Sequence, residues 1–598
     1  MKKLFLFIIC ITVASFAQDK NKMQKEVQQY LNEYNKTYQV LLKDYNEAEW
    51  KLNTYIVEED TLSSAAARVA NENFAKFTGS KENIEKSTKY LKEKDKLTDL
   101  QVRQLNAILY AAGSFPQTIP DIVSARIKAE KLQVEKLFGY DFKVDGKSIT
   151  ANDIDEGLMN STNVDERLKL WNSSKEVGKG LKDGLANLQQ LRNKSVQALG
   201  YKDFFSYQVA EYGMSSEEML KINQDMIKEI WPLYRELHTW ARYYLAEKYK
   251  QEVPDMLPAQ WLPNRWGQEW NGMIKVEGLD IDPVLKTKSA EWIVKEGEKF
   301  YISLGFDPLP QTFWKKSSLY PLSADSKIKK NNHASAWHID NANDLRSLMS
   351  VEPNTAWWGT ALHELGHIYY FMSYSNENVP IILRTGANRA YHEAIGSLIG
   401  LAAIQKPFLT NLGLLEKDSK SDEMLGLLNE ALDYIVFTPF SAGVMTEFEY
   451  DLYANNLPKD QYNAKWWELV RKYQGIVPPS ERGEEYCDAA TKTHINDDAG
   501  QYYDYALSNL LLFQFHDYIS KKILKQDPHA TNYWGNKEIG EFLYNMMKPG
   551  MSVDWREHLR NTIGEDMSAK AMMDYFAPLY DYLKKVNEGR KYTLPEAI

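Results

Sequence analysis

The chain has 598 residues, of which 44% are hydrophobic, and this length is enough to bury a large core. Its 82 acidic and 72 basic residues are spread along the whole sequence and give a formal net charge of −10. Because this balance lacks the basic surface that nucleic-acid-binding proteins need, we expect no nucleic-acid partner.

Residues 1–17 have the pattern of an export signal. Two lysines follow Met1, an apolar run comes next, and small residues stand at Ser15 and Ala17. This pattern predicts cleavage after Ala17 and export to the periplasm or the extracellular space. A membrane anchor is the alternative, but the run is shorter than the roughly 20 residues of a spanning helix, and no later segment is long enough. We therefore predict a mature domain over 18–598 without a membrane anchor.

Cysteine usage excludes an intrachain disulfide in the mature chain. Of the two cysteines, Cys10 lies in the apolar run of the export signal, and only Cys487 remains after cleavage. Stability outside the cytoplasm must therefore come from the size of the core and from any metal that the protein binds.

Helical patterns dominate the chain in sequence order. Between residues 21 and 137, apolar and aromatic residues recur at spacings of three and four, which is typical of amphipathic helices. Further helical segments lie at 181–199, 217–248, 425–451 and 502–524. Strand-like runs of β-branched residues are scarce, and the breaks that contain Pro and Gly are too short to separate domains. The sequence therefore predicts a single, all-α domain.

A metal-binding motif lies in the middle of the chain. The segment 353–355, Pro-Asn-Thr, offers a cap and a start for a helix that carries His363, Glu364 and His367. Histidines four residues apart share one helical face, so both imidazoles can bind one zinc ion. Glu364 lies beside them, where its carboxylate can act on a water molecule without being a ligand. The alternative is a buried helix whose histidines are satisfied by hydrogen bonds.

A third metal ligand is expected on a second predicted helix, which opens after 386–388. Glu393 follows His363 by thirty residues, and His392 is the competing candidate. Only one of the two can be the ligand, because adjacent residues of a helix point to different faces. Three protein ligands leave a fourth position for water, as in catalytic zinc sites. Half of the ten histidines lie between His333 and His392, which a reacting centre explains better than packing.

Short motifs recur in a fixed order along the mature chain. They are Asn-Glu-Tyr at 32–34, Ala-Glu-Trp at 48–50, Leu-Pro-Ala at 257–259, Trp-Gly-Gln-Glu-Trp at 266–270, His-Ala-Ser-Ala-Trp at 333–337, His-Glu-Leu-Gly-His-Ile at 363–368, Gly-Ala-Asn at 386–388, His-Glu-Ala-Ile-Gly at 392–396, Lys-Tyr-Gln-Gly at 472–475, Pro-Pro at 478–479, Lys-Thr-His-Ile at 492–495 and Phe-Gln-Phe-His at 513–516. In this order they resemble the angiotensin-converting enzyme family of zinc peptidyl-dipeptidases, over nearly all of the mature chain.

The resemblance implies an almost wholly helical ellipsoid divided by a deep groove, with the N-terminal helices as a lid. It implies the release of dipeptides from the free C-terminal end of oligopeptides, and it favours Glu393 over His392 as the third zinc ligand. Two alternatives stay open, namely a carboxypeptidase or oligopeptidase on the same frame and a catalytically silent peptide-binding protein. The complete set of His363, Glu364, His367 and Glu393 argues against the silent protein.

The resemblance also implies which group donates a hydrogen bond to the oxyanion of the reaction. This donor would be Tyr505, assisted by His494. Tyr503 and Tyr502 stay as substitutes, because the alignment needs one inserted residue between Lys492 and Tyr505.

Further residues are expected to bind the peptide. The resemblance implies that His333 and the backbone of Ala334 hold it near the reaction centre. It also implies that Lys492, Tyr502 and Gln268 bind the C-terminal carboxylate, while the alternative for Lys492 is an exposed surface lysine. Gln268 favours dipeptide release, because the carboxypeptidase branch of the family carries Arg there.

Two features depart from the family's pattern. The family has an Asp four residues after the third ligand, where it orients a zinc-bound histidine, but this chain has Ser397. The absence of this Asp is expected to weaken zinc binding or to require another partner for the histidine. The family's chloride-binding arginines fall at Asp504 and at Val470, although Arg471 is adjacent. We therefore predict activity that does not depend on chloride.

Overall fold

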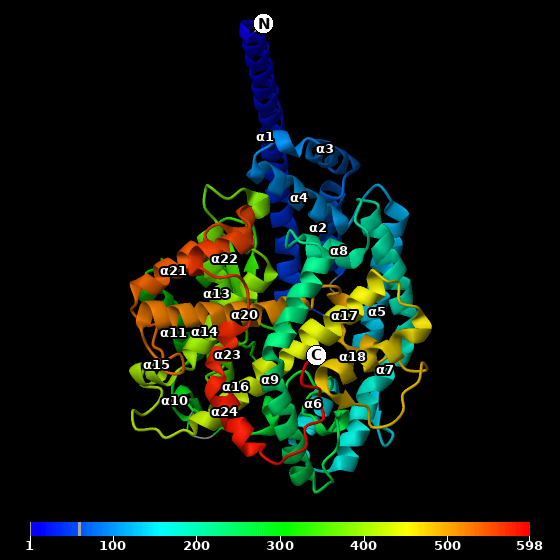
Figure 1. Ribbon diagram of the computed structural model, residues 1–598, viewed down its shortest axis with the longest axis vertical. Coiled ribbons are helices and arrows are strands. Elements are labelled where there is room, and N and C mark those ends of the chain that lie inside the picture. Colours follow the sequence, from blue (N-terminus) through cyan, green and yellow to red (C-terminus); the bar gives the residue numbers. More distant parts are fainter. Residues whose placement is uncertain (1, 58–60, 277, 279, 324, 332) are drawn as a thin grey trace.

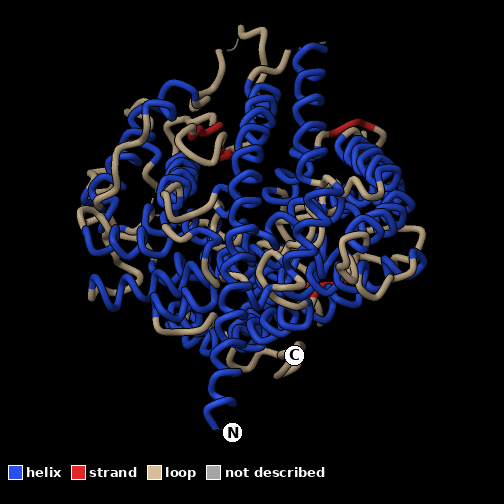
Figure 2. Tube along the Cα trace, turned by 90° about the horizontal axis from the view of Figure 1, so that it is seen from above, coloured by secondary structure: helices blue, strands red, loops and turns tan. Residues whose placement is uncertain are grey.

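The computed structural model describes residues 2–57, 61–276, 278, 280–323, 325–331 and 333–598, and of residues 2–17 and 61 it describes the backbone only. The described chain is built of packed helices, with a few short strands between them (Figures 1 and 2). The predicted all-α class and the single domain are therefore confirmed.

The α-helices have the following bounds. They are α1 (Lys2–Thr54), α2 (Thr61–Thr78), α3 (Lys81–Leu91), α4 (Asp99–Gly113), α5 (Pro120–Phe138), α6 (Ala151–Asn160), α7 (Val164–Gln197), α8 (Phe204–Ala210), α9 (Ser216–Tyr249), α10 (Asp282–Leu285), α11 (Ala290–Leu304), α12 (Gln311–Lys316), α13 (Thr355–Tyr374), α14 (Arg389–Ala403), α15 (Lys406–Asn411), α16 (Glu423–Thr438), α17 (Thr446–Tyr453), α18 (Tyr462–Gln474), α19 (Thr493–Asp497), α20 (Tyr503–Tyr518), α21 (Lys537–Met547), α22 (Trp555–Ile563), α23 (Lys570–Tyr575) and α24 (Ala577–Val586).

The strands of the described residues form two-stranded ladders. They are β1 (Phe142–Val144) with β2 (Lys147–Ile149), antiparallel, β3 (Leu257–Pro258) with β6 (Ile476–Val477), parallel, and β4 (Ser335–His338) with β5 (Leu345–Leu348), antiparallel. The ladder of β4 and β5 packs against α13 and so lies beside the metal-binding motif.

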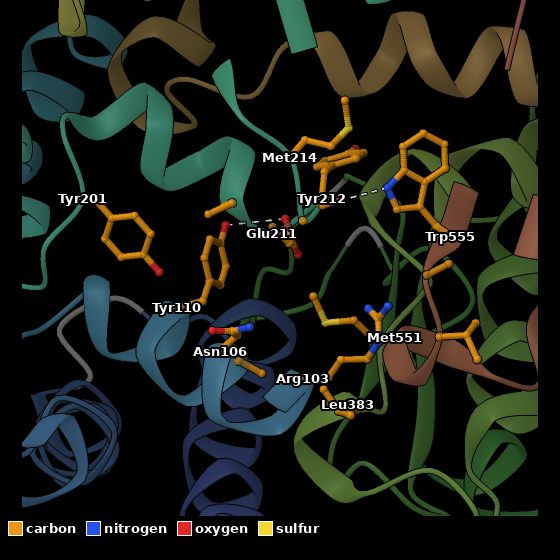
Figure 3. A pocket seen from close by; sticks show the side chains of 15 residues that line it. Arg103, Asn106, Tyr110, Tyr201, Glu211, Tyr212, Met214, Leu383, Met551 and Trp555 are labelled. Carbon is orange, nitrogen blue, oxygen red and sulfur yellow. Dashed lines mark hydrogen bonds between the residues drawn. The ribbon is translucent and has the colours of Figure 1, made fainter. Parts of the chain in front are cut away.

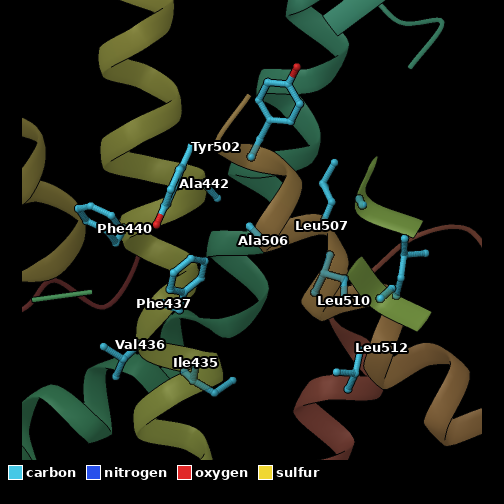
Figure 4. Packing of buried hydrophobic residues seen from close by; sticks show 14 of the residues in the cluster. Ile435, Val436, Phe437, Phe440, Ala442, Tyr502, Ala506, Leu507, Leu510 and Leu512 are labelled. Carbon is cyan, nitrogen blue, oxygen red and sulfur yellow. The ribbon is translucent and has the colours of Figure 1, made fainter. Parts of the chain in front are cut away.

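One large apolar core holds the body of the protein together. Helix α16, the π-helical turn Pro439–Met445 and helix α20 contribute neighbouring side chains to it, including Phe437, Phe440 and Leu507 (Figure 4). Each such side chain, when fully buried, stabilises the folded state by about 1.5–3 kcal/mol. Cys487 is buried in this core and free, so stability does not depend on a disulfide among the described residues.

The N-terminal helices form a layer of their own, as the resemblance implies for a lid. Helices α1 to α4 lie together at one end of the molecule (Figure 1) and share a second apolar cluster that includes Leu31 and Ile108. This cluster also takes in Leu383, from the short 3₁₀ helix Ile381–Leu383 between α13 and α14. Helices α1 to α4 therefore pack against the segment that connects α13 and α14, the two helices on which the metal ligands are expected.

The predicted export signal falls in the first part of α1, where Met1 lies outside the described residues and the side chains of 2–17 are not described. Helix α1 extends beyond the other helices at this end (Figure 1). None of the helices formed by the described residues combines the length and the apolar character that a membrane crossing needs.

Candidate metal centre and substrate site

Helix α13 carries the three residues of the metal-binding motif. It begins at Thr355, where the side chain of Asn354 accepts a hydrogen bond from the backbone N–H of Trp357 at 2.9 Å. Such a cap satisfies one of the free N–H groups at a helix start, and it lies where the sequence predicts it.

The structure brings together the donor atoms of His363, His367 and Glu393. The Nε2 atoms of the two histidines are 3.1 Å apart, and the Nε2 of His363 lies 3.8 Å from a carboxylate oxygen of Glu393. All three donor atoms lie within 4.8 Å of one another. Burial lowers the pKa of each histidine to about 4, with a smaller effect of His367 on His363, so both rings are neutral at pH 7. Two neutral imidazoles and a carboxylate make a donor set that suits zinc.

Helix α14 supplies the third donor because it approaches α13 unusually closely. The side chain of Asn388 caps α14 by accepting from the N–H of Tyr391 at 3.0 Å. The two helices meet at glycines, since a Cβ on Gly366 would lie 3.0 Å from the Cα of Gly396. A Cβ on Gly396 would in turn lie 2.8 Å from the ring of His363. Glycine at this crossing therefore lets Glu393 reach the histidines.

His392 lies behind His367 and not within the cluster of donor atoms. Its Nδ1 is 2.9 Å from the Nδ1 of His367, and its ring stacks on Tyr370. A hydrogen bond between these nitrogens orients the His367 ring so that Nε2 faces the other donors. Within the described residues, Ser397 forms no hydrogen bond to a ligand histidine. His392 is therefore a hydrogen-bonding partner of His367, whereas the sequence alone suggests it only as a competing ligand.

Glu364 follows His363 directly on α13 and has a buried carboxyl oxygen without a hydrogen-bond partner among the described residues. Its side chain is 7% exposed, and this oxygen is Oε2. Burial and, to a smaller extent, the charge of Glu393 raise the pKa of this carboxyl to about 8. Burial without a hydrogen-bond partner thus moves this pKa toward neutral pH, which is the range in which a side chain can both take up and release a proton during catalysis.

The structure separates Tyr505 from its two alternatives. The hydroxyl of Tyr505 lies 3.5 Å from Nε2 of His494 and accepts a hydrogen bond from Arg389 at 3.2 Å. Tyr503 points into the core, where its ring packs against aromatic neighbours and its hydroxyl is buried without a partner among the described residues. Tyr502 faces Gln268 instead, with its hydroxyl 3.4 Å from the amide oxygen.

Lys492 is buried beside Gln268 and Tyr502. Its ammonium donates to the Gln268 amide oxygen at 2.6 Å and lies 4.5 Å from the centre of the Trp266 ring. The residue is only 4% exposed, so the alternative of a surface lysine is wrong. Burial lowers the pKa of Lys492 to about 7, although the nearby charge of Glu269 acts in the opposite direction. Within the described residues no carboxylate lies within salt-bridge distance of its ammonium, so this group is suited to bind an anionic group of a ligand.

His333 and Ala334 lie at the entry to β4, which packs against α13. His333 is exposed, and its Nδ1 lies 2.7 Å from the carbonyl oxygen of Ala334. No hydrogen bond among the described residues links either of them to the three metal-donor side chains.

At the positions of the family's chloride-binding arginines, this chain has a different set of charges. Asp504 is fully buried and accepts a hydrogen bond from the Tyr212 hydroxyl at 2.5 Å. Its other oxygen lies 3.6 Å from Nε of Arg389, whereas Val470 is buried in the core. The sequence alone does not single out Arg389 as a site residue. Its only distinguishing feature in the sequence is its position directly after Asn388, which caps α14.

Comparisons with known proteins identify the family of this chain. The family described as "Angiotensin-converting enzyme" matches residues 21–594. An angiotensin-converting enzyme of Theromyzon tessulatum is 29% identical over 94% of this chain and 92% of its own length. Enzymes of that name from Oryctolagus cuniculus and Sus scrofa are 30% and 29% identical over 96% of this chain, which spans only 44% of their length. The chain therefore belongs to the angiotensin-converting enzyme family of peptidases.

Proposed function

We propose that this protein is an exported, zinc-dependent peptidyl-dipeptidase that releases dipeptides from the free C-terminal end of oligopeptides. The observation that carries the proposal is the meeting of the His363, His367 and Glu393 donor atoms within 4.8 Å of one another, beside the free carboxylate oxygen of Glu364. Family membership supports a peptidase, and the buried Lys492 supports recognition of a chain end.

The donor set fits a zinc ion. His363, His367 and Glu393 would hold it, because their two neutral imidazoles and one carboxylate leave a further coordination position open. The bound ion would supply Lewis acidity, which polarises the scissile carbonyl and lowers the pKa of a water molecule to about 7.

The residues around these donors have complementary tasks. Glu364 takes the proton of the attacking water and passes it to the departing amine, a role that contributes about 10²–10⁴-fold to the rate. The Tyr505 hydroxyl, next to His494, donates to the oxygen that becomes negatively charged in the transition state. His333 and the backbone of Ala334 hold the peptide chain.

Recognition of the chain end falls to the buried cation and its neighbours. Lys492 pairs with the C-terminal carboxylate, and Tyr502 and Gln268 form hydrogen bonds around it. Without its anionic partner the Lys492 ammonium would stay buried and unpaired, so peptides that end in an amide bind weakly. Residues 1–17 serve as the export signal, and activity does not depend on chloride.

Product analysis tests this function. The purified protein is incubated with an oligopeptide of free C-terminus and with its C-terminal amide, before and after chelation and with zinc restored. Dipeptides released from the free acid alone, lost on chelation and regained with zinc, are the expected result. Single amino acids would indicate a carboxypeptidase, internal fragments would indicate an oligopeptidase, and metal-free binding without cleavage would indicate a silent protein.

A further inference from the structure

Arg389 links the helix of the third metal donor to the tyrosine of the oxyanion site. It is the first residue of α14, one turn before Glu393. Its Nη1 and Nη2 donate to the two carboxylate oxygens of Asp498 at 3.0 and 2.7 Å, and Nη2 also donates to the Tyr505 hydroxyl at 3.2 Å. A planar guanidinium that is held at both ends has one orientation, and this orientation places the tyrosine hydroxyl.

Few other contacts hold this hydroxyl. Among the described residues, its second polar neighbour is His494, at the longer distance of 3.5 Å. Tyr505 lies in the first turn of α20, a different helix from the one that carries Glu393. The hydrogen bond from Arg389 therefore sets the position of the Tyr505 hydroxyl relative to the metal donors.

An internal carboxylate holds the guanidinium in place. Burial alone would raise the pKa of Asp498, but its hydrogen bonds with Arg389 and the charge of that residue lower the pKa below its ordinary value. Asp498 is therefore ionised at neutral pH. A carboxyl oxygen of Asp504 lies 3.6 Å from Nε of Arg389, and the other oxygen of Asp504 accepts a hydrogen bond from Tyr212. Tyr212 lines a cavity of about 300 Å³ (Figure 3). The guanidinium thus has its counter-ion within the protein.

We propose that Arg389 is a positioning residue for Tyr505 and that Asp498 is the built-in anion that keeps Arg389 in place, so that the site needs no anion from solution. The proposal rests on the proposed peptidase function. It gives a physical reason for the predicted independence from chloride, since the place of a mobile anion next to the cation is taken by a carboxylate of the same chain.

A double-mutant cycle tests the coupling between the two side chains. Loss of one oxyanion donor costs about 10²–10³-fold in kcat, so Tyr505→Phe is expected to lose that much. Arg389→Gln is expected to lose about tenfold to a hundredfold in kcat, with KM changed less than about threefold, because it removes a transition-state interaction. The double variant is expected to have a kcat no lower than that of Tyr505→Phe alone. If the kcat losses of the two single variants multiply in the double variant, or if Arg389→Gln changes KM alone, the proposal is overturned.

A matched control comes from another ion pair of similar exposure. Arg556 binds Asp554 through two hydrogen bonds, with 29% and 27% of the side chains exposed, against 28% and 29% for Arg389 and Asp498. Arg556→Gln is expected to leave kcat unchanged. A kcat loss there equal to that of Arg389→Gln would show a general effect of losing a partly exposed ion pair and would overturn the positioning role.

A second variant keeps the proposal testable if Arg389→Gln does not fold. Asp498→Ala leaves a space beside the guanidinium that a halide can enter. Its kcat is expected to fall about tenfold in halide-free buffer and to recover severalfold with added chloride, while the unaltered protein does not respond. Stimulation of the unaltered protein, or an Asp498→Ala variant with neither effect, would overturn the proposal. An unaltered protein that cleaves no peptide in any buffer would instead overturn the proposed peptidase function.

Discussion

Substitution of Gly396 by alanine tests whether the close approach of α13 and α14 builds the metal centre. The added Cβ would lie 2.8 Å from Cε1 and 2.9 Å from both nitrogens of the His363 ring. Carbon atoms at rest lie about 3.5–4.0 Å apart. The ring, or the whole of α14, must therefore move by roughly 0.6–1.2 Å, and this movement is expected to separate His363 from the other donors.

The size of the effect follows from this displacement. A misplacement of about 1 Å at a catalytic group costs on the order of 10²-fold in rate. Loss of ligand orientation typically costs about 10–100-fold in metal affinity, which corresponds to roughly 1.4–2.7 kcal/mol. Gly396→Ala is therefore expected to lower kcat/KM by about 10²-fold and zinc affinity by about tenfold or more.

Helix α14 offers its own control. Gly400 lies on the same helix, and a Cβ there would have no heavy atom within 4 Å. Gly400→Ala is expected to leave zinc affinity and turnover unchanged and to stabilise the fold by about 0.4–1 kcal/mol, since alanine loses less conformational entropy in a helix. Zinc competition with a chromogenic chelator, dipeptide release and thermal unfolding measure the three quantities. If Gly396→Ala matched Gly400→Ala in all of them, the steric argument would be refuted.

Three other predictions concern the site. Glu364→Gln is expected to retain zinc and to lose about 10²–10⁴-fold in kcat; Glu296→Gln, an equally buried control at 7% exposure, should keep its turnover. Because the pKa of Lys492 is about 7, its ammonium is charged below that pH, so KM for free-acid peptides should rise as pH rises through 7. A KM that does not depend on pH contradicts this prediction. A pH dependence of KM that is the same in Lys492→Met also contradicts it. Free zinc at 100 to 1,000 times its dissociation constant should stabilise the fold by about 3–4 kcal/mol. Chelation should therefore lower the unfolding temperature, and added zinc should restore it; an unfolding temperature that chelation leaves unchanged contradicts this.

Much of the site was predictable because it depends on local geometry. Residues four apart on a helix share a face whatever surrounds them, so His363 and His367 are recognisable from spacing alone. The same holds for the start of α13, where Asn354 is the residue that caps it. The all-α class followed similarly, from helical periodicity along the chain.

What could not be predicted depends on contacts between distant segments. His392 contacts His367 across two helices, and adjacency to Glu393 in the sequence suggested competition for the metal and not support of a ligand. Arg389 meets Asp498 and Tyr505, which are more than one hundred positions away along the chain. No local periodicity encodes such pairs, because they depend on where α14 and α20 cross.

Helix α14 organises the centre through residues that share one face. Arg389, Glu393 and Gly396 are spaced at i, i+4 and i+7, so they lie along one stripe of the helix. They reach Tyr505, the donor cluster and the ring of His363, respectively. Because one helix places all three, the proposed function predicts that a shift of α14 disturbs metal binding and oxyanion stabilisation together. Substitutions along this stripe should therefore show strong energetic coupling, whereas pairs of substitutions further apart than about 7–10 Å usually add.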